Sequence, residues 1–138
     1  MPKRITVLAY ALFGFAVLLA GVAAIGAVLV GLDRETLWSS FLITNTAIGL
    51  SAAPCGLLIA RAKPDKPIGW LFLIVGIAPL LTAATAPLMI YGAARDWPEF
   101  ALRLLVTINM FSWSWGVFCC LPLILQLFPT GTPVSRRW

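Results

Sequence analysis

The sequence predicts an all-α integral membrane protein with four transmembrane helices. Hydrophobic residues make up 61% of the 138 residues and charged residues only 11%, whereas roughly a quarter of the residues in soluble domains are charged. The charges are also segregated, because the stretches 5–32, 36–60, 67–94 and 104–135 contain no Asp, Glu, Lys or Arg. Each stretch exceeds the ~20 residues that a helix needs to cross ~30 Å of hydrocarbon. At this length the chain is expected to form a single transmembrane domain over residues 1–138.

The positions of the cations predict how the four helices are oriented. If the N-terminus is cytoplasmic, the inner segments contain seven cations and one acid, and the outer segments contain three cations and four acids. The inner cations are Lys3, Arg4, Arg61, Lys63, Lys66, Arg136 and Arg137. An excess of cations on the cytoplasmic side is typical of membrane proteins, so we expect a multipass protein of the plasma membrane with both termini cytoplasmic. The net charge of +5 follows from this topology, and no basic soluble surface for nucleic acid is predicted.

The first helix is expected at about 5–32 and the second at about 37–60. Ala16, Ala20 and Ala24 recur at four-residue spacing in the first helix, and small residues on one stripe let transmembrane helices approach closely. Because the outer loop of residues 33–36 is short, we expect this stripe to pack against the second helix. Pro54 should kink the second helix, either as a purely structural bend or as a hinge used in signalling.

The third helix is expected at about 67–93 and should be bent by Pro79 and Pro87. The fourth helix is expected at about 99–128, and a cytoplasmic tail of residues 129–138 follows it. Trp113 and Trp115 lie too deep in the fourth helix for the aromatic belt at a membrane interface. We therefore expect their indole rings to face other helices.

The basic turn RAKPDKPIGW, residues 61–70, is the longest polar run between the expected helices. Lys63 and Lys66 precede prolines and are expected to be extended, and Pro67 can open the third helix as its first residue. This turn and the end of the chain carry two motifs, KPDKPIGWLFLIVG (63–76) and LPLILQLFPTGTPVSRRW (121–138). They resemble the cytoplasmic hairpin and the helix exit in the N-terminal multipass membrane region of actinobacterial two-component sensor histidine kinases. The matching positions include Pro67, Ile68, Gly69, Trp70, Phe128, Pro129, Gly131, Ser135, Arg136, Arg137 and Trp138.

The resemblance implies a non-catalytic membrane module for sensing and anchoring in signal transduction. Lys66 stands where the family usually has Asn, and Thr132 stands where Arg is common. The 138 residues include no dimerisation or ATP-binding domain, so the expected chain is a truncated kinase or is encoded alone. The expected partners are the lipid bilayer and a second copy or a larger membrane protein that contacts the helices, and no ligand is identified.

Two other functions stay open, a small transporter subunit and a structural assembly partner. No carboxylate lies within an expected helix, which argues against coupled transport. The chain has no histidine, which excludes a phospho-accepting histidine and argues against an enzyme. Cys55, Cys119 and Cys120 could form a three-thiolate cluster, but free cysteines usually pack as small hydrophobic residues. No catalytic, cofactor or metal site is therefore expected.

The two deepest amides, Asn45 and Asn109, predict a polar pocket inside the bundle. Their helices both run inward, and eight or nine residues place each amide roughly 12–14 Å from the outer boundary. Polar side chains at such depth usually face other helices rather than lipid, so we expect the two amides to face each other. The residues expected around them are Thr44, Thr46, Thr107 and Ser112. The pocket is either a helix–helix hydrogen bond worth ~0.6 to about 2 kcal/mol, which is the favoured interpretation, or the place where a stimulus binds.

Overall fold

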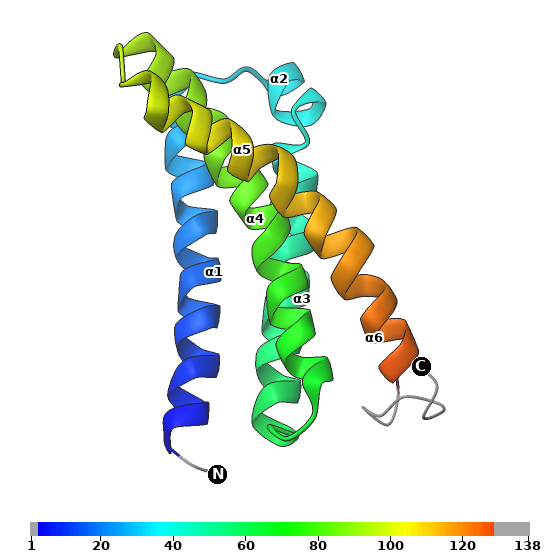
Figure 1. Cartoon of the computed structure of the whole chain (residues 1–138). Helices are drawn as coiled ribbons and strands as arrows, with labels where there is room; N and C mark the ends of the chain where they lie inside the picture. Colours follow the sequence, from blue (N-terminus) through cyan, green and yellow to red (C-terminus); the bar gives the residue numbers. More distant parts are fainter. Residues whose placement is uncertain (1–2, 129–138) are drawn as a thin grey trace.

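Four long helical segments run antiparallel through the computed structural model, which describes residues 3–128 (Figure 1). Their lengths and compositions suit membrane crossing over Ile5–Val30, Leu42–Ala62, Pro67–Ala94 and Glu99–Leu127. No strand occurs in this part of the chain. The prediction of an all-helical chain with four helices of membrane-spanning length is confirmed. The helices are α1 (Lys3–Val30), α2 (Arg34–Ser39), α3 (Leu42–Ala62), α4 (Pro67–Ala94), α5 (Glu99–Trp115), the π-helical turn η1 (Gly116–Cys120) and α6 (Leu121–Leu127).

The two ends of the bundle hold different connections. The beginning of α1, the α3–α4 turn and the end of α6 lie at one end (Figure 1). Helix α2 and the α4–α5 turn lie at the opposite end. Long segments that are neighbours in the chain therefore run in opposite directions.

The helix expected at 37–60 is divided into the short helix α2 and the long helix α3. The carboxylate of Asp33 caps α2 by accepting a hydrogen bond of 3.0 Å from the backbone N–H of Thr36. Phe41 then adopts a left-handed backbone with φ 58°, a conformation uncommon outside glycine. Helix α2 buries none of its residues, whereas α3 starts with the buried Leu42. The break at Phe41 separates a surface helix from a packed one, and no glycine or proline signals it in the sequence.

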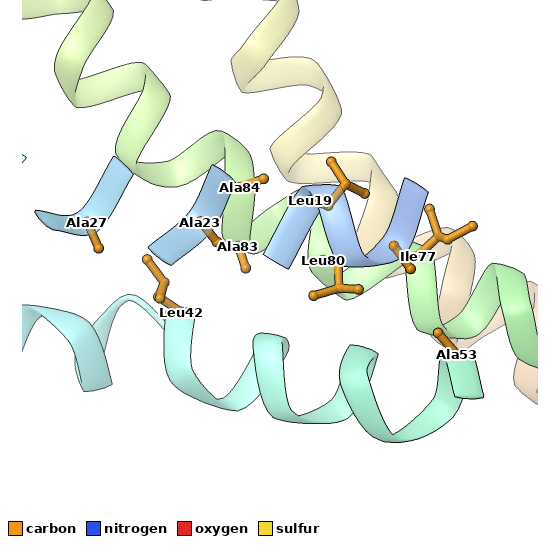
Figure 2. Packing of buried hydrophobic residues seen from close by; sticks show 10 residues of the cluster. Leu19, Ala23, Ala27, Leu42, Ala53, Ile77, Leu80, Ala83 and Ala84 are labelled. Atoms are coloured by element: carbon orange, nitrogen blue, oxygen red, sulfur yellow. The ribbon is translucent and has the colours of Figure 1, made fainter. Parts of the chain in front are cut away.

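Helix α4 is the central element of the bundle and contacts α1, α3, α5, η1 and α6. Half of its most apolar window is buried, compared with 11% for the span from Glu99 to Leu127. Figure 2 shows the core between α1, α3 and α4. It contains Leu19, Ala23, Ala27, Leu42, Ala53, Ile77, Leu80, Ala83 and Ala84.

The expected packing face of the first helix is wrong in detail. Ala16 is fully buried, but Ala20 is half-buried and Ala24 is exposed. The buried alanines instead include Ala16 and Ala23, seven residues apart, which is a repeat of nearly two helical turns. Helix α1 packs chiefly against α4 rather than against α3. The short outer loop keeps α1 close to α3. Helix α1 nevertheless makes most of its contacts with α4, which is the most deeply buried of the long helices.

The α3–α4 pair is held in backbone contact by four glycines, Gly49, Gly56, Gly69 and Gly76, which we call the glycine contact. A Cβ atom on Gly56 would lie 2.5 Å from the backbone nitrogen of Leu73, and one on Gly76 would lie 2.6 Å from that of Ala53. Real Cβ atoms do not approach backbone so closely, so only glycine fits at these positions. Association in lipid depends on this kind of close packing because the hydrophobic effect does not drive helices together there.

The last membrane-length span changes its helical geometry part of the way along. After α5, the N–H of Leu121 bonds to the carbonyl of Gly116, which gives the wide π-helical turn η1. Pro122 has no N–H and its ring crowds the preceding turn, and a wide turn relieves that crowding. From this point the span diverges from α1, as the position of α6 in Figure 1 shows, while η1 and α6 stay in contact with α4.

Candidate functional site

A cavity of about 470 Å³ lies between the start of α3 and the middle of α4 and α5. We call it the polar cavity, and its lining contains two amides, two hydroxyls and two aromatic rings, all uncharged. The lining residues are Ser40, Phe41, Asn45, Thr82, Asn109 and Trp113. Both amides that the sequence singled out therefore line one cavity.

Asn109 connects α5 to α4. Its Nδ2 group donates one hydrogen bond of 3.0 Å to the carbonyl of Thr82 and another of 3.0 Å to Oγ1 of Thr85. One turn further along α5, the hydroxyl of Ser112 lies 2.9 Å from the hydroxyl of Thr82. The hydroxyl of Thr82 also donates to the carbonyl of Asn109 at 3.4 Å. Four polar contacts thus join the two helices at the level of the polar cavity.

Asn45 is in a different situation, although only 5% of its surface is exposed. Its backbone N–H bonds to the carbonyl of Phe41, but within residues 3–128 its side-chain amide forms no hydrogen bond. The expected pairing with Asn109 is not a hydrogen bond in this structure, and the Nδ2 group of Asn109 donates to Thr82 and Thr85 instead. The two amides share a cavity without contacting each other through a hydrogen bond.

The other polar residues expected around the amides are distributed unevenly. Ser112 belongs to the Asn109 contact, whereas Thr44, Thr46 and Thr107 donate to carbonyls of their own helices. Thr107 is also exposed. It lies two residues from Asn109, and helix positions two apart do not share a face. Ser112 lies three residues from Asn109 and does share it.

Sequence reasoning missed Thr82 and Thr85, which are the partners of Asn109. Thr85 is buried, with 5% of its surface exposed, and its hydroxyl donates to the carbonyl of Leu81 at 2.7 Å. The two threonines stand three residues apart between Pro79 and Pro87. Polar residues at i and i+3 in an otherwise apolar helix mark a polar stripe, and this signal was available in the sequence.

The residues of the first family motif pack the α3–α4 turn. Pro67 opens α4, Ile68 is buried, and a Cβ atom on Gly69 would clash with the backbone of Ala60. The indole N–H of Trp70 donates to the carbonyl of Pro64 at 3.1 Å, which closes the turn. In the second motif Phe128 is exposed, and Pro129, Gly131, Ser135, Arg136, Arg137 and Trp138 lie outside the described residues.

The deep tryptophans and the cysteines occupy separate environments. Trp113 lines the polar cavity and packs edge-on against Phe118, with ring centroids 6.2 Å apart. Trp115 is 63% exposed, so the expectation that it faces another helix is wrong for this chain alone.

Cys55 and Cys119 are exposed and Cys120 is buried. In residues 3–128 no group of three or more potential ligands from His, Cys, Asp and Glu is placed to hold a metal ion.

Comparisons with protein-family models, with curated proteins and with solved structures found no match to this chain. The function is therefore argued from the residues and their arrangement.

Proposed function

We propose that the chain is a non-catalytic sensing and anchoring module of the plasma membrane, similar to the input region of a two-component sensor histidine kinase. The observation that carries the proposal is the α3–α4 hairpin around KPDKPIGW, the motif that resembles this family. Ile68, Gly69 and Trp70 each have a specific packing role in that hairpin. The hairpin supplies a fixed body, and the weakly buried span from α5 to α6 supplies a part that can move against it.

The polar cavity supports a sensing role because it lies where the fixed and movable parts meet. Asn109 holds α5 to α4 through hydrogen bonds at one wall of this cavity. A change inside the cavity would alter the contacts of α5, and α6 continues from α5 toward the end of the bundle that holds the basic turn (Figure 1). A signal could leave the membrane along this span.

The proposed orientation places that end of the bundle in the cytoplasm, with both termini. Arg61, Lys63 and Lys66 stand at the α3–α4 turn, and cations prefer the cytoplasmic side. Single cysteines at Asp65 and Asp96 in a cysteine-free background test this arrangement. In intact cells an impermeant thiol reagent should label position 96 and spare position 65. Labelling of position 65 from outside would overturn the orientation.

A chimera tests the sensing role. Residues 1–138 are joined in frame to the cytoplasmic domains of a two-component kinase, and autophosphorylation is measured in membranes. Asn109→Leu, which removes both side-chain hydrogen bonds of Asn109 to α4, should change the kinase activity at least threefold. Thr107→Val should not change it, because Thr107 bonds only to its own helix. Equal activity in all three chimeras would contradict the proposal. The chain alone should incorporate no phosphate from ATP, and incorporation would contradict its non-catalytic role.

A structural assembly partner is the second candidate. The last span keeps large apolar side chains exposed, including Trp115, Phe118 and Leu125, and these could contact a second copy or a larger membrane protein as well as lipid. Cross-linking of Leu125→Cys between copies, together with unchanged activity in the chimeras, would favour assembly over sensing.

A further inference from the structure

The side chain of Asn45 presents a problem of solvation that the bundle does not solve. The residue is 95% buried, since 5% of its surface is exposed, and its amide has no hydrogen-bond partner in residues 3–128. A carboxamide offers two donor hydrogens and an acceptor oxygen with two lone pairs. Among the described residues no fully enclosed side-chain N or O atom lacks a partner, so the amide of Asn45 opens onto the cavity that it lines. Only an occupant of that cavity can satisfy these groups, and leaving them unpaired is costly. A partner for this amide is therefore missing from the described part of the chain, residues 3–128.

The space next to Asn45 can hold that partner. The polar cavity measures about 470 Å³, which falls within the range of roughly 300–1,000 Å³ typical of small-molecule sites. Ser40 and Phe41, at one part of its lining, are exposed, so the cavity reaches the protein surface beside the break between α2 and α3. A molecule can enter there without separating the core helices.

The lining indicates which chemistry would fit. Thr82 and Ser112 already bond to each other, and Nδ2 of Asn109 is committed to α4. Within the described residues, the lining groups left without a side-chain hydrogen bond are the amide of Asn45, the Oδ1 atom of Asn109, the hydroxyl of Ser40 and the indole N–H of Trp113. Ser40 and Trp113 are exposed, so the ligand has to match the two amides. A ligand therefore needs a donor and an acceptor side by side for Asn45, and a further N–H for Asn109. A primary carboxamide has all three.

The charge and the shape of the cavity lining restrict the class of ligand further. All six lining residues are uncharged, and a charged ligand would lose its hydration without gaining a counter-ion. Phe41 and Trp113 contribute aromatic side chains to the lining, and aromatic rings favour offset or edge-on contact with another ring. The body of the ligand is therefore flat and apolar.

We infer that the polar cavity is a binding site for an uncharged aromatic carboxamide, which pairs with Asn45 through its amide and contacts Phe41 and Trp113 through its ring. The inference deepens the proposed function, on which its consequence for signalling rests. Binding itself requires no kinase and is measured on the purified chain.

Benzamide is the probe for the test, with the full chain in lipid nanodiscs and saturation-transfer NMR as the readout. We expect saturable binding of benzamide that ethylbenzene and benzoate do not displace, because the first lacks the amide and the second carries a charge. Asn45→Leu keeps the volume of the side chain and removes its hydrogen-bonding groups, and should weaken binding at least tenfold. Thr107→Val, outside the lining, should leave binding unchanged.

A second variant separates loss of the site from loss of the fold. Phe41→Gly removes one aromatic side chain at a position with φ 58°, where glycine is favoured, so the variant should fold and bind benzamide at least threefold more weakly. Equal binding of benzamide and ethylbenzene, or benzamide binding that Asn45→Leu leaves intact, would overturn the inference. Absence of saturable benzamide binding to the wild-type chain would overturn it as well, and would leave water as the partner of Asn45.

The chimera described above then distinguishes the two proposals. Saturable binding with no effect of benzamide on kinase activity supports the site and contradicts the sensing role for this ligand class. A response to Asn109→Leu without any benzamide binding supports the sensing role and contradicts the site.

Discussion

The contact of α4 with α3 and its contact with α5 have opposite compositions. On the α3 side, the glycine contact brings backbone against backbone, and close packing provides the attraction. On the α5 side, Asn109 and Ser112 bond to threonines of α4 next to a cavity. Close packing has no alternative arrangement of similar energy, whereas a few polar contacts can exchange partners. One helix therefore belongs to a rigid pair and to an adjustable pair at once.

Gly69→Ala should have the largest effect, because it acts on the rigid pair. The new Cβ atom would meet the backbone of Ala60. We expect the unfolding free energy to fall by about 3 kcal/mol, the upper end of the usual cost of overpacking. The measurement is reversible unfolding in mixed detergent micelles, followed by circular dichroism.

Gly14→Ala provides the matched control for Gly69→Ala. A Cβ atom on Gly14 would meet nothing within 4 Å, so this change should be neutral or stabilise the helix by up to about 1 kcal/mol. Similar losses in both variants would mean that the glycine contact is not what holds α3 to α4.

Asn109→Leu should have the next largest effect, because it removes both hydrogen bonds from Asn109 to α4. We expect a loss of about 1–2 kcal/mol and a longer, broader distance between spin labels at Leu58 of α3 and Leu125 of α6. Both label positions are exposed. Thr107→Val serves as the control and should leave the distance distribution as it is. An unchanged distribution in Asn109→Leu would show that packing alone holds α5.

Double-mutant cycles sharpen the assignment of partners to Asn109. Asn109→Ala and Thr85→Val should be coupled by about 0.6–1.7 kcal/mol, the range for hydrogen bonds between membrane helices. Asn109→Ala and Asn45→Ala should be additive within about 0.5 kcal/mol, since no hydrogen bond joins these two amides. Coupling between Asn109 and Asn45, together with additivity between Asn109 and Thr85, would instead support the direct pairing of the two amides that the sequence predicts.

Trp70→Phe should cost about 0.5–1.5 kcal/mol, because it removes one hydrogen bond to the carbonyl of Pro64 and keeps most of the ring. The effect is smaller than that of Gly69→Ala because the turn only closes a hairpin that the glycine contact already holds. Unfolding under the same conditions measures it, with the exposed Trp115→Phe as the control. A loss as large for Trp115 would indicate a general cost of removing an indole.

The smallest effect concerns α2, which lies outside the rigid pair and depends on its cap. The hydrogen bonds from Thr36 lower the pKa of the Asp33 carboxyl, so the charged form is favoured when α2 is formed. The cap is fully present above the ordinary pKa of aspartate and is lost as the pH falls through the lowered value. The amide resonance of Thr36 should report this loss on acidification. Asp33→Asn, which caps without a charge, should remove the dependence on pH, and a transition that persists in it would assign the effect to another group.

The rigid part of the fold was easier to predict from the sequence than the adjustable part. Charge-free stretches placed the spans, because burying a charge in hydrocarbon is costly wherever it occurs. The break at Phe41 escaped prediction because it depends on Leu42 entering the core, and no local signal accompanies it. Matching depths correctly brought Asn45 and Asn109 to one cavity. The depth of a residue in the membrane does not specify which side of its helix it faces. The sequence prediction therefore includes Thr107, which lies on another face, and omits Thr82 and Thr85, the partners of Asn109 on α4.

The glycine contact also determines how the molecule meets a bilayer of changing thickness. Helix α4 has 28 residues and α3 has 21, and the difference of seven residues corresponds to ~10 Å along the axis. Because the two backbones touch, neither helix can slide or tilt alone to match its length to the hydrocarbon, which is how single helices usually respond to mismatch. Helix α3, the shorter of the two, is therefore preceded by α2 at one end of the bundle. A thicker bilayer would pull the α2–α3 junction toward the hydrocarbon. Membrane tension or lipid length would thus act first on Phe41, at the entrance to the polar cavity.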